Sequence, residues 1–228
     1  MAQRSQSLSR DGSAHVTDES INAATHLAAG CFALLGTVLL VVQAIEMHSI
    51  WKTVGFLVYG LSLINLFTFS TLHHGLNLSD KTNNVLRTFD YLSIFGLIGG
   101  TVTPIVLVMY RNPFGWSVLA VVWAIIALGV TLRSVFLDLP KYITSTLFIV
   151  LGWLPVLLLM LGGTTLPAGA IALLASGGIL YTAGLVLFSL EWPNPWPGKF
   201  GFHEIWHIMV ALAALCHFMF MYLYVLPY

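Results

Sequence analysis

The chain closes with the apolar segment His203 to Leu226, which has the sequence HEIWHIMVALAALCHFMFMYLYVL. A helix needs about 20 apolar residues to cross a bilayer, and this segment meets that length. It begins with His203 and His207, which lie one turn apart on a helix with roughly 5–6 Å between their Cβ atoms. Both imidazoles can therefore reach one zinc ion. An H-E-x-x-H run is typical of zinc proteases, in which Glu204 would be the general base. Its place at the start of a membrane helix instead favours a site completed by residues from upstream segments.

The composition places the chain in the membrane. Hydrophobic residues make up 58% of its 228 positions and charged residues 8%, whereas a soluble domain has about 25% charged residues. The mean hydropathy is +0.89. The net charge of zero gives no reason to expect a nucleic-acid partner.

Seven apolar stretches, each near the length of a bilayer crossing, follow a polar, Ser-rich start. We therefore predict an all-α, integral membrane bundle of seven transmembrane helices over residues 21–228, preceded by a disordered tail of residues 1–20. The predicted location is the cell membrane. The stretches run approximately from Ile21 to Ala44, Ile50 to Leu72, Leu86 to Tyr110, Phe114 to Phe136, Lys141 to Leu161, Leu166 to Leu190 and His203 to Leu226.

The basic residues predict the orientation, because cytoplasmic loops carry an excess of Lys and Arg. With seven crossings, the N-terminus and the even-numbered loops share one side, and the odd-numbered loops carry only Lys52 and Arg111. We therefore predict a cytoplasmic N-terminus and an external C-terminus. The basic residues on the predicted cytoplasmic side are Arg4, Arg10, Lys81, Arg87, Arg133, Lys141 and Lys199.

Polar and ionisable side chains gather at the predicted cytoplasmic ends of four of these stretches. An ionisable residue inside a membrane costs a few kcal/mol, about +2.5–3.5 on insertion scales at the helix centre. Several ionisable residues at the same depth therefore indicate a polar site and not a chance occurrence. The members are Glu19, Asn22 and His26 in the first stretch, Ser70, His73 and His74 in the second, Asp90 about one turn into the third, and His203, Glu204 and His207 in the last.

Histidines alone do not decide between structural hydrogen bonding and metal binding. For His203 and His207 the two are equally supported, and the addition of Asp90 and a Ser-x-x-x-His pattern at the same depth favours a metal. His73 and His74 diverge by about 100° on a helix, so only one should face the site. His217 lies ten residues beyond His207, about 15 Å along the axis, and is predicted to be a buried hydrogen-bonding histidine, with a proton relay as the alternative.

Four motifs in this order resemble the bacterial hemolysin III family, which lies within the progestin and adipoQ receptor group and is related to the alkaline ceramidases. The resemblance covers almost the whole chain after the tail. The family's pattern has a tyrosine where this chain has His73, and the Ser-x-x-x-His spacing selects His74. The motifs are Glu19-Ser20-Ile21-Asn22 with Thr25-His26, Ser70-Thr71-Leu72-His73-His74, Asp90 with Gly99 to Pro104, and His203-Glu204-Ile205-Trp206-His207 with His217 beyond.

The resemblance implies a zinc ion near the cytoplasmic face, held by His74, His203 and His207. Asp90 would hold a water in the fourth position and act as base, with the Ser70 hydroxyl beside it. Three protein ligands and an open position are typical of a catalytic zinc. The implied activity is hydrolysis of an amide or ester bond in a membrane lipid.

Three other functions remain open at this point. The same zinc could be structural in a non-enzymatic membrane receptor or membrane-homeostasis regulator. A pore-forming haemolysin is suggested by the family name alone, since no residue pattern indicates secretion. An intramembrane zinc protease would need Glu204 at the metal. The sequence specifies neither the lipid nor the oligomeric state.

Overall fold

The structure is a computed structural model that describes residues 19–135, 141–163 and 165–228, and its regular elements within these ranges are helices. The all-helical prediction is therefore confirmed, and the predicted tail falls almost wholly outside the described residues. The elements are α1 (Glu19–Glu46), α2 (Ile50–Gly75), α3 (Asp80–Met109), α4 (Pro113–Val135), α5 (Lys141–Gly152), α6 (Leu154–Leu161), α7 (Ala168–Leu190) and α8 (Phe202–Phe220), which a π-helical turn, η1 (Met221–Val225), extends.

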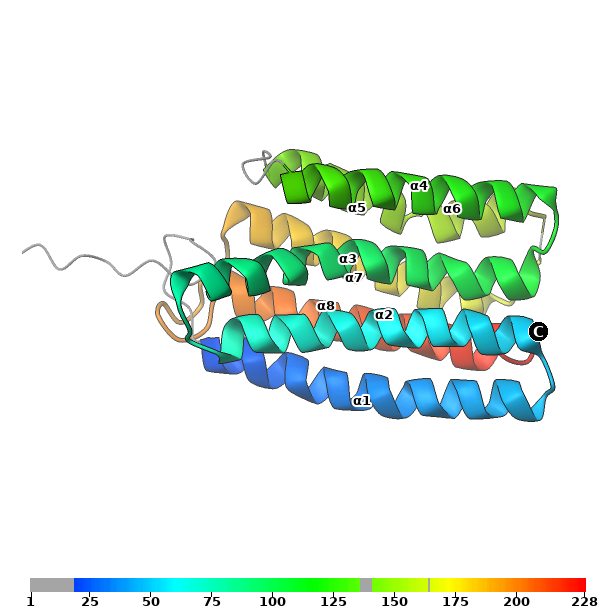
Figure 1. The fold of residues 1–228 in the computed structure, drawn as a ribbon, viewed down its shortest axis with the longest axis horizontal. Helices are drawn as coiled ribbons and strands as arrows, with labels where there is room; N and C mark the ends of the chain where they lie inside the picture. Colours follow the sequence, from blue (N-terminus) through cyan, green and yellow to red (C-terminus); the bar gives the residue numbers. More distant parts are fainter. Residues whose placement is uncertain (1–18, 136–140, 164) are drawn as a thin grey trace, which may run out of the picture.

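The helices lie side by side along the long axis of the molecule (Figure 1). The start of α1, the α2–α3 connection and the start of α8 lie at one end, and the C-terminus lies at the other. Helix α1 packs against α2 and α8, α2 packs against α3, and α7 packs against α8. The segments that carry the predicted polar layer therefore meet at one end of the bundle.

Within the part of the chain that the structure describes, six helices are long and apolar enough to cross a membrane, namely α1, α2, α3, α4, α7 and α8 with its π-helical extension. The chain is therefore a multi-pass membrane protein. The fifth predicted span is divided at Trp153 into α5 and α6, each too short to be counted among the six. Pro155 has no N–H to donate, which interrupts the helical hydrogen-bond ladder there.

Capping residues set two boundaries differently from the prediction. The Ser79 side chain accepts a hydrogen bond from the backbone N–H of Thr82, so α3 begins at Asp80 rather than at Leu86. Asp90 consequently lies about 15 Å from the start of its helix, and about one turn beyond Leu86, where the apolar stretch begins. Helix α2 continues to Gly75, which places His73 and His74 in its last turn.

Small residues bring α2 and α3 close together. A Cβ added at Gly55 would lie 2.9 Å from the Cα of Pro104, and one added at Gly100 would collide with the Ser62 side chain. Membrane helices commonly pack through such small residues. Helix α3 is also the most buried of the six long helices, so it forms the centre of the bundle and holds Asp90 against α2.

Candidate metal centre

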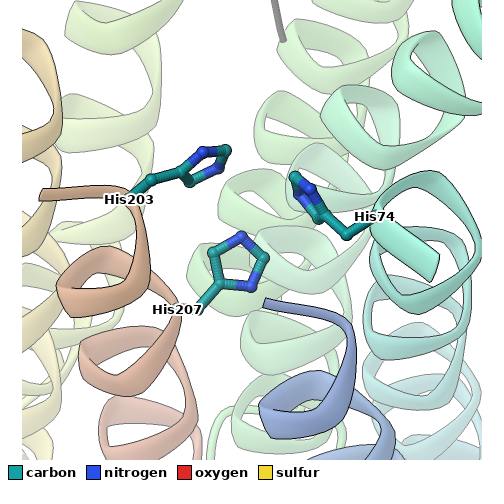
Figure 2. A group of neighbouring side chains, drawn as sticks. All are labelled: His74, His203 and His207. Atoms are coloured by element: carbon teal, nitrogen blue, oxygen red, sulfur yellow. The ribbon is translucent and has the colours of Figure 1, made fainter. Parts of the chain in front are cut away.

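Three histidines from two helices face one another at the end of the bundle (Figure 2). His74 comes from the last turn of α2, and His203 and His207 come from the first turns of α8. One ring nitrogen of each lies within 4.8 Å of those of the other two. Each side chain is 2–3% exposed. This is the group that the resemblance implied as ligands, and its arrangement could hold a metal ion.

The donors fit such an ion chemically as well as geometrically. Imidazole nitrogens are common ligands of zinc and other first-row divalent ions. The Nδ1 atom of His207 is buried and has no hydrogen-bond partner among the described residues. A buried polar atom left unpaired costs about 1–3 kcal/mol, a cost that a cation bound by this ring system would help to offset.

A carboxylate from α1 fixes the orientation of His74. The Oε2 atom of Glu19 lies 2.5 Å from Nδ1 of His74. A histidine that donates Nδ1–H to a carboxylate presents the lone pair of Nε2 to a metal, and such carboxylates hold the ring of metal-binding histidines in place. Glu19 therefore lies directly against the candidate metal centre.

Asp90 and Ser70 lie beside the three histidines. The Ser70 hydroxyl, which is 2% exposed, forms a hydrogen bond with the Asp90 carboxylate. The carboxylate oxygen of Asp90 and ring nitrogens of His73 and His74 lie within 4.8 Å of one another. The structure thus brings a hydroxyl, a carboxylate and the histidine group together from α2, α3 and α8.

The expected divergence of His73 and His74 is wrong. Both side chains are 2% exposed, and their ring centroids are 4.5 Å apart. The angle of about 100° between neighbours describes the directions of the Cβ atoms, whereas the rings extend beyond Cβ and here approach each other. Of the two, His74 is the member of the group with His203 and His207, and His73 lies on the side of Asp90.

Helix α1 also contributes His26 and Asn22. The Nε2 atom of His26 lies 3.2 Å from the backbone oxygen of His207, and the two ring centroids are 4.0 Å apart. Asn22 is fully buried, and neither its Oδ1 nor its Nδ2 has a hydrogen-bond partner among the described residues. His26 therefore lies against the histidine group on the side of α1, and Asn22 is one turn before it on the same helix.

Glu204 has a local structural role in this arrangement. Its Oε2 accepts a hydrogen bond from the backbone N–H of Gly201 at 2.7 Å, which caps the start of α8, and the side chain is fully buried. An acidic side chain in the first turn also suits the helix dipole. One oxygen of the carboxylate that made the motif resemble a zinc protease is thus engaged at the helix terminus, whereas its Oε1 is buried without a partner among the described residues.

His217 lies outside the group. Its Nε2 is 3.3 Å from the backbone oxygen of Leu174 on α7, and the side chain is 7% exposed. It lines an apolar cavity between α3, α5, α7 and α8, together with Thr101, Tyr181 and Trp206. No motif in the sequence had indicated this cavity. Gly178, which also lines it, belongs to a Gly-Gly pair in α7 that could have indicated a place where side-chain volume is missing.

Comparison with known proteins identifies the family. The model of the family described as "Haemolysin-III related" matches residues 14–218. Hemolysin-3 of Bacillus cereus is 31% identical over 213 residues, which cover 93% of this chain and 94% of that protein. A hemolysin-3 homolog of Bacillus subtilis is 29% identical over 86% of this chain and 88% of its own length. The human monocyte to macrophage differentiation factor is 24% identical over 74% of this chain and 69% of its own length. The chain therefore belongs to the haemolysin-III related family, within the progestin and adipoQ receptor group.

Proposed function

We propose that this protein is a zinc-dependent membrane hydrolase that cleaves an amide or ester bond in a lipid. The observation that carries the proposal is the Ser70–Asp90 hydrogen bond beside the group of His74, His203 and His207. A structural metal site needs ligands alone. A carboxylate positioned by a hydroxyl, next to three histidine donors, is the combination that hydrolysis of a carbonyl compound requires.

Each residue would have a separate task. His74, His203 and His207 would hold zinc, and a zinc ion with three protein ligands polarises a carbonyl and lowers the pKa of a bound water to about 7. Asp90 would accept the proton of the attacking water and return it to the leaving group. Ser70 would keep the Asp90 carboxylate oriented through its hydrogen bond. Glu19 would hold the His74 ring in its ligating orientation.

The apolar cavity suits the hydrocarbon part of a lipid. It extends along α8 from Trp206, which neighbours His207, to His217. Eleven residues of helix correspond to about 16 Å, so a long chain could lie along α8 below the histidines. Its other walls include Ile94, one turn beyond Asp90 on α3. The cavity therefore begins close to the residues assigned to the chemistry.

The proposal includes seven crossings with the zinc site near the cytoplasmic face. Backbone hydrogen bonds from Trp153 to Ile149 and from Leu157 to Trp153 carry the helical path across the junction of α5 and α6. From Lys141 to Leu161 a continuous helix would rise about 31 Å, close to the thickness of the hydrocarbon core. Counted as one crossing, this pair would bring the total to seven and put the two termini on opposite sides of the membrane. The distribution of basic residues then favours a cytoplasmic N-terminus and an external C-terminus.

A second candidate is a membrane receptor or regulator in which zinc only joins the helices. The position of His26 favours it, because its ring is 4.0 Å from that of His207 and could close the site with a fourth nitrogen. A closed site with four ligands is typical of structural zinc.

A measurement of lipid hydrolysis distinguishes the two candidate functions. Purified protein would be incubated with N-ethyl lauramide and with ethyl laurate, and the released lauric acid would be measured for the wild type and Asp90→Asn. The proposal expects release by the wild type, a loss of at least about a hundredfold in the variant, as for removal of a general base, and unchanged zinc content. Equal release by both proteins would remove Asp90 from the chemistry. No release by a zinc-loaded wild type would favour the structural role.

A further inference from the structure

The side chain of Asn22 is a fully buried amide whose two polar atoms are both left without a partner. Its exposed fraction is 0%, and neither Oδ1 nor Nδ2 forms a hydrogen bond with the described residues. Two threonines of the same helix behave differently. The hydroxyls of Thr25 and Thr37 donate to carbonyls of their own helix. Asn22 therefore retains a donor and an acceptor for a group outside this helix.

The position of Asn22 on α1 shows where that group would lie. Glu19, Asn22 and His26 are spaced by three and four residues, so Asn22 is within about 60° of the other two around the helix axis. Glu19 contacts His74 on α2, and His26 contacts the backbone of His207 on α8. Asn22 lies between these two contacts along the same face, and it is consequently directed toward the space beside the histidine group.

We propose that Asn22 recognises the amide group of the substrate, accepting its N–H at Oδ1, and so makes the site specific for secondary amides over esters. This inference rests on the proposed hydrolase function and narrows its substrate class. In a trans secondary amide the N–H points away from the carbonyl oxygen. A carbonyl directed at the histidine group therefore presents its N–H on another side, where a separate acceptor is needed.

An ester lacks the donor that this acceptor would use. The ester oxygen in place of N–H would leave Oδ1 of Asn22 buried and unpaired, and a site built to bond a donor rejects an analogue that lacks it.

Binding tests the inference independently of turnover. The zinc-loaded Asp90→Asn protein, in detergent, would be titrated with three probes of the same chain length: N-ethyl lauramide, N-ethyl-N-methyl lauramide and ethyl laurate. The secondary amide should bind about tenfold more tightly than either of the others, which is the effect of one neutral hydrogen bond. This comparison needs no change at Asn22, so it holds even if a variant there fails to fold.

Adding Asn22→Leu should remove that preference by weakening N-ethyl lauramide about tenfold while the other two probes change less than about threefold. The matched control is Thr37→Val, which removes a buried hydroxyl from α1 without removing a free donor or acceptor, and it should change none of the three. Equal affinities for the three probes in the parent protein, or a uniform loss in Asn22→Leu, would overturn the inference. A preserved amide preference without turnover in the wild type would instead contradict the hydrolase proposal alone.

Discussion

Glu19 and His74 are 55 positions apart in the sequence, and their side chains meet with 2.5 Å between Oε2 and Nδ1. Glu19 is the first residue of α1, and His74 lies in the last turn of α2. The contact therefore joins the first turn of the membrane domain to the histidine group. Hydropathy alone would identify Glu19 only as a charged residue at the end of a membrane span. The contact shows that it also orients the ring of His74.

Removing the Glu19 carboxylate should weaken metal binding. In Glu19→Ala the ring of His74 would lose the partner that fixes its orientation, and loss of such a partner typically lowers metal affinity roughly 10- to 100-fold. The measurement is competition for zinc between the purified protein and a chelator of known affinity. The matched control is Glu46→Gln, at the exposed opposite end of α1, which should bind zinc as the wild type does. Unaltered affinity in Glu19→Ala would contradict a role for this contact.

The histidine pair of α8 was predictable because it depends on helical spacing within a single segment. Placing His74 beside this pair required a long-range inference, which came from the shared depth of the polar residues and the Ser-x-x-x-His pattern. The close approach of His73 to His74 was not predictable, since the direction of a ring beyond Cβ depends on packing. The start of α3 was misplaced because Ser79 caps the helix well before the apolar stretch begins. Hydropathy locates lipid-facing residues, whereas capping determines where a helix starts.

The proposed ligands should differ sharply from the other histidine of α8. His207→Ala removes one of three donors, and the purified variant should lose most of its zinc, from about one ion per chain. His217→Ala, on the same helix but bonded to the backbone of Leu174, should retain it. Elemental analysis after dialysis against a weak chelator measures both. Zinc retained at wild-type stoichiometry in His207→Ala would exclude this residue as a necessary ligand.

Ser70→Ala should have a smaller effect on hydrolysis than Asp90→Asn. The hydroxyl orients the carboxylate but does not itself take up the proton, so its loss should cost one hydrogen bond to a charged group, about 1.5–3 kcal/mol or roughly 10- to 150-fold in kcat/KM. Zinc content should remain that of the wild type. Release of lauric acid from N-ethyl lauramide is the measurement, with Ser62→Ala on the same helix as control, because the Ser62 hydroxyl bonds to the carbonyl of Tyr59. A loss as large as that of Asp90→Asn would place Ser70 in the proton transfer itself.

Glu204 should prove to stabilise α8 rather than to act in catalysis. In Glu204→Ala the backbone N–H of Gly201 loses its acceptor, and loss of a helix cap costs about 1 kcal/mol. The midpoint of thermal unfolding in detergent should therefore fall. Glu204→Gln keeps an acceptor oxygen and should retain both zinc and lipid hydrolysis close to the wild-type level. If Glu204→Gln lost hydrolysis while keeping zinc and its unfolding midpoint, the carboxylate would belong to the chemistry and the zinc-protease interpretation would regain support.

The number of crossings can be decided by labelling single cysteines in intact cells with a membrane-impermeant maleimide. Single cysteines would be introduced into a chain in which Cys31 and Cys216 are replaced by serine. Seven crossings place Ser79 and Lys199 in the cytoplasm, because the α2–α3 and α7–α8 connections lie at the same end of the bundle (Figure 1). Ser79→Cys and Lys199→Cys should be protected until the cells are permeabilised, whereas Arg111→Cys and Thr165→Cys should react at once. If α5 and α6 did not cross together, Thr165 and Ser79 would share a side and would label alike. That result would reverse the direction of α8 in the membrane and separate His203 from His74, so it would contradict the metal centre together with the topology.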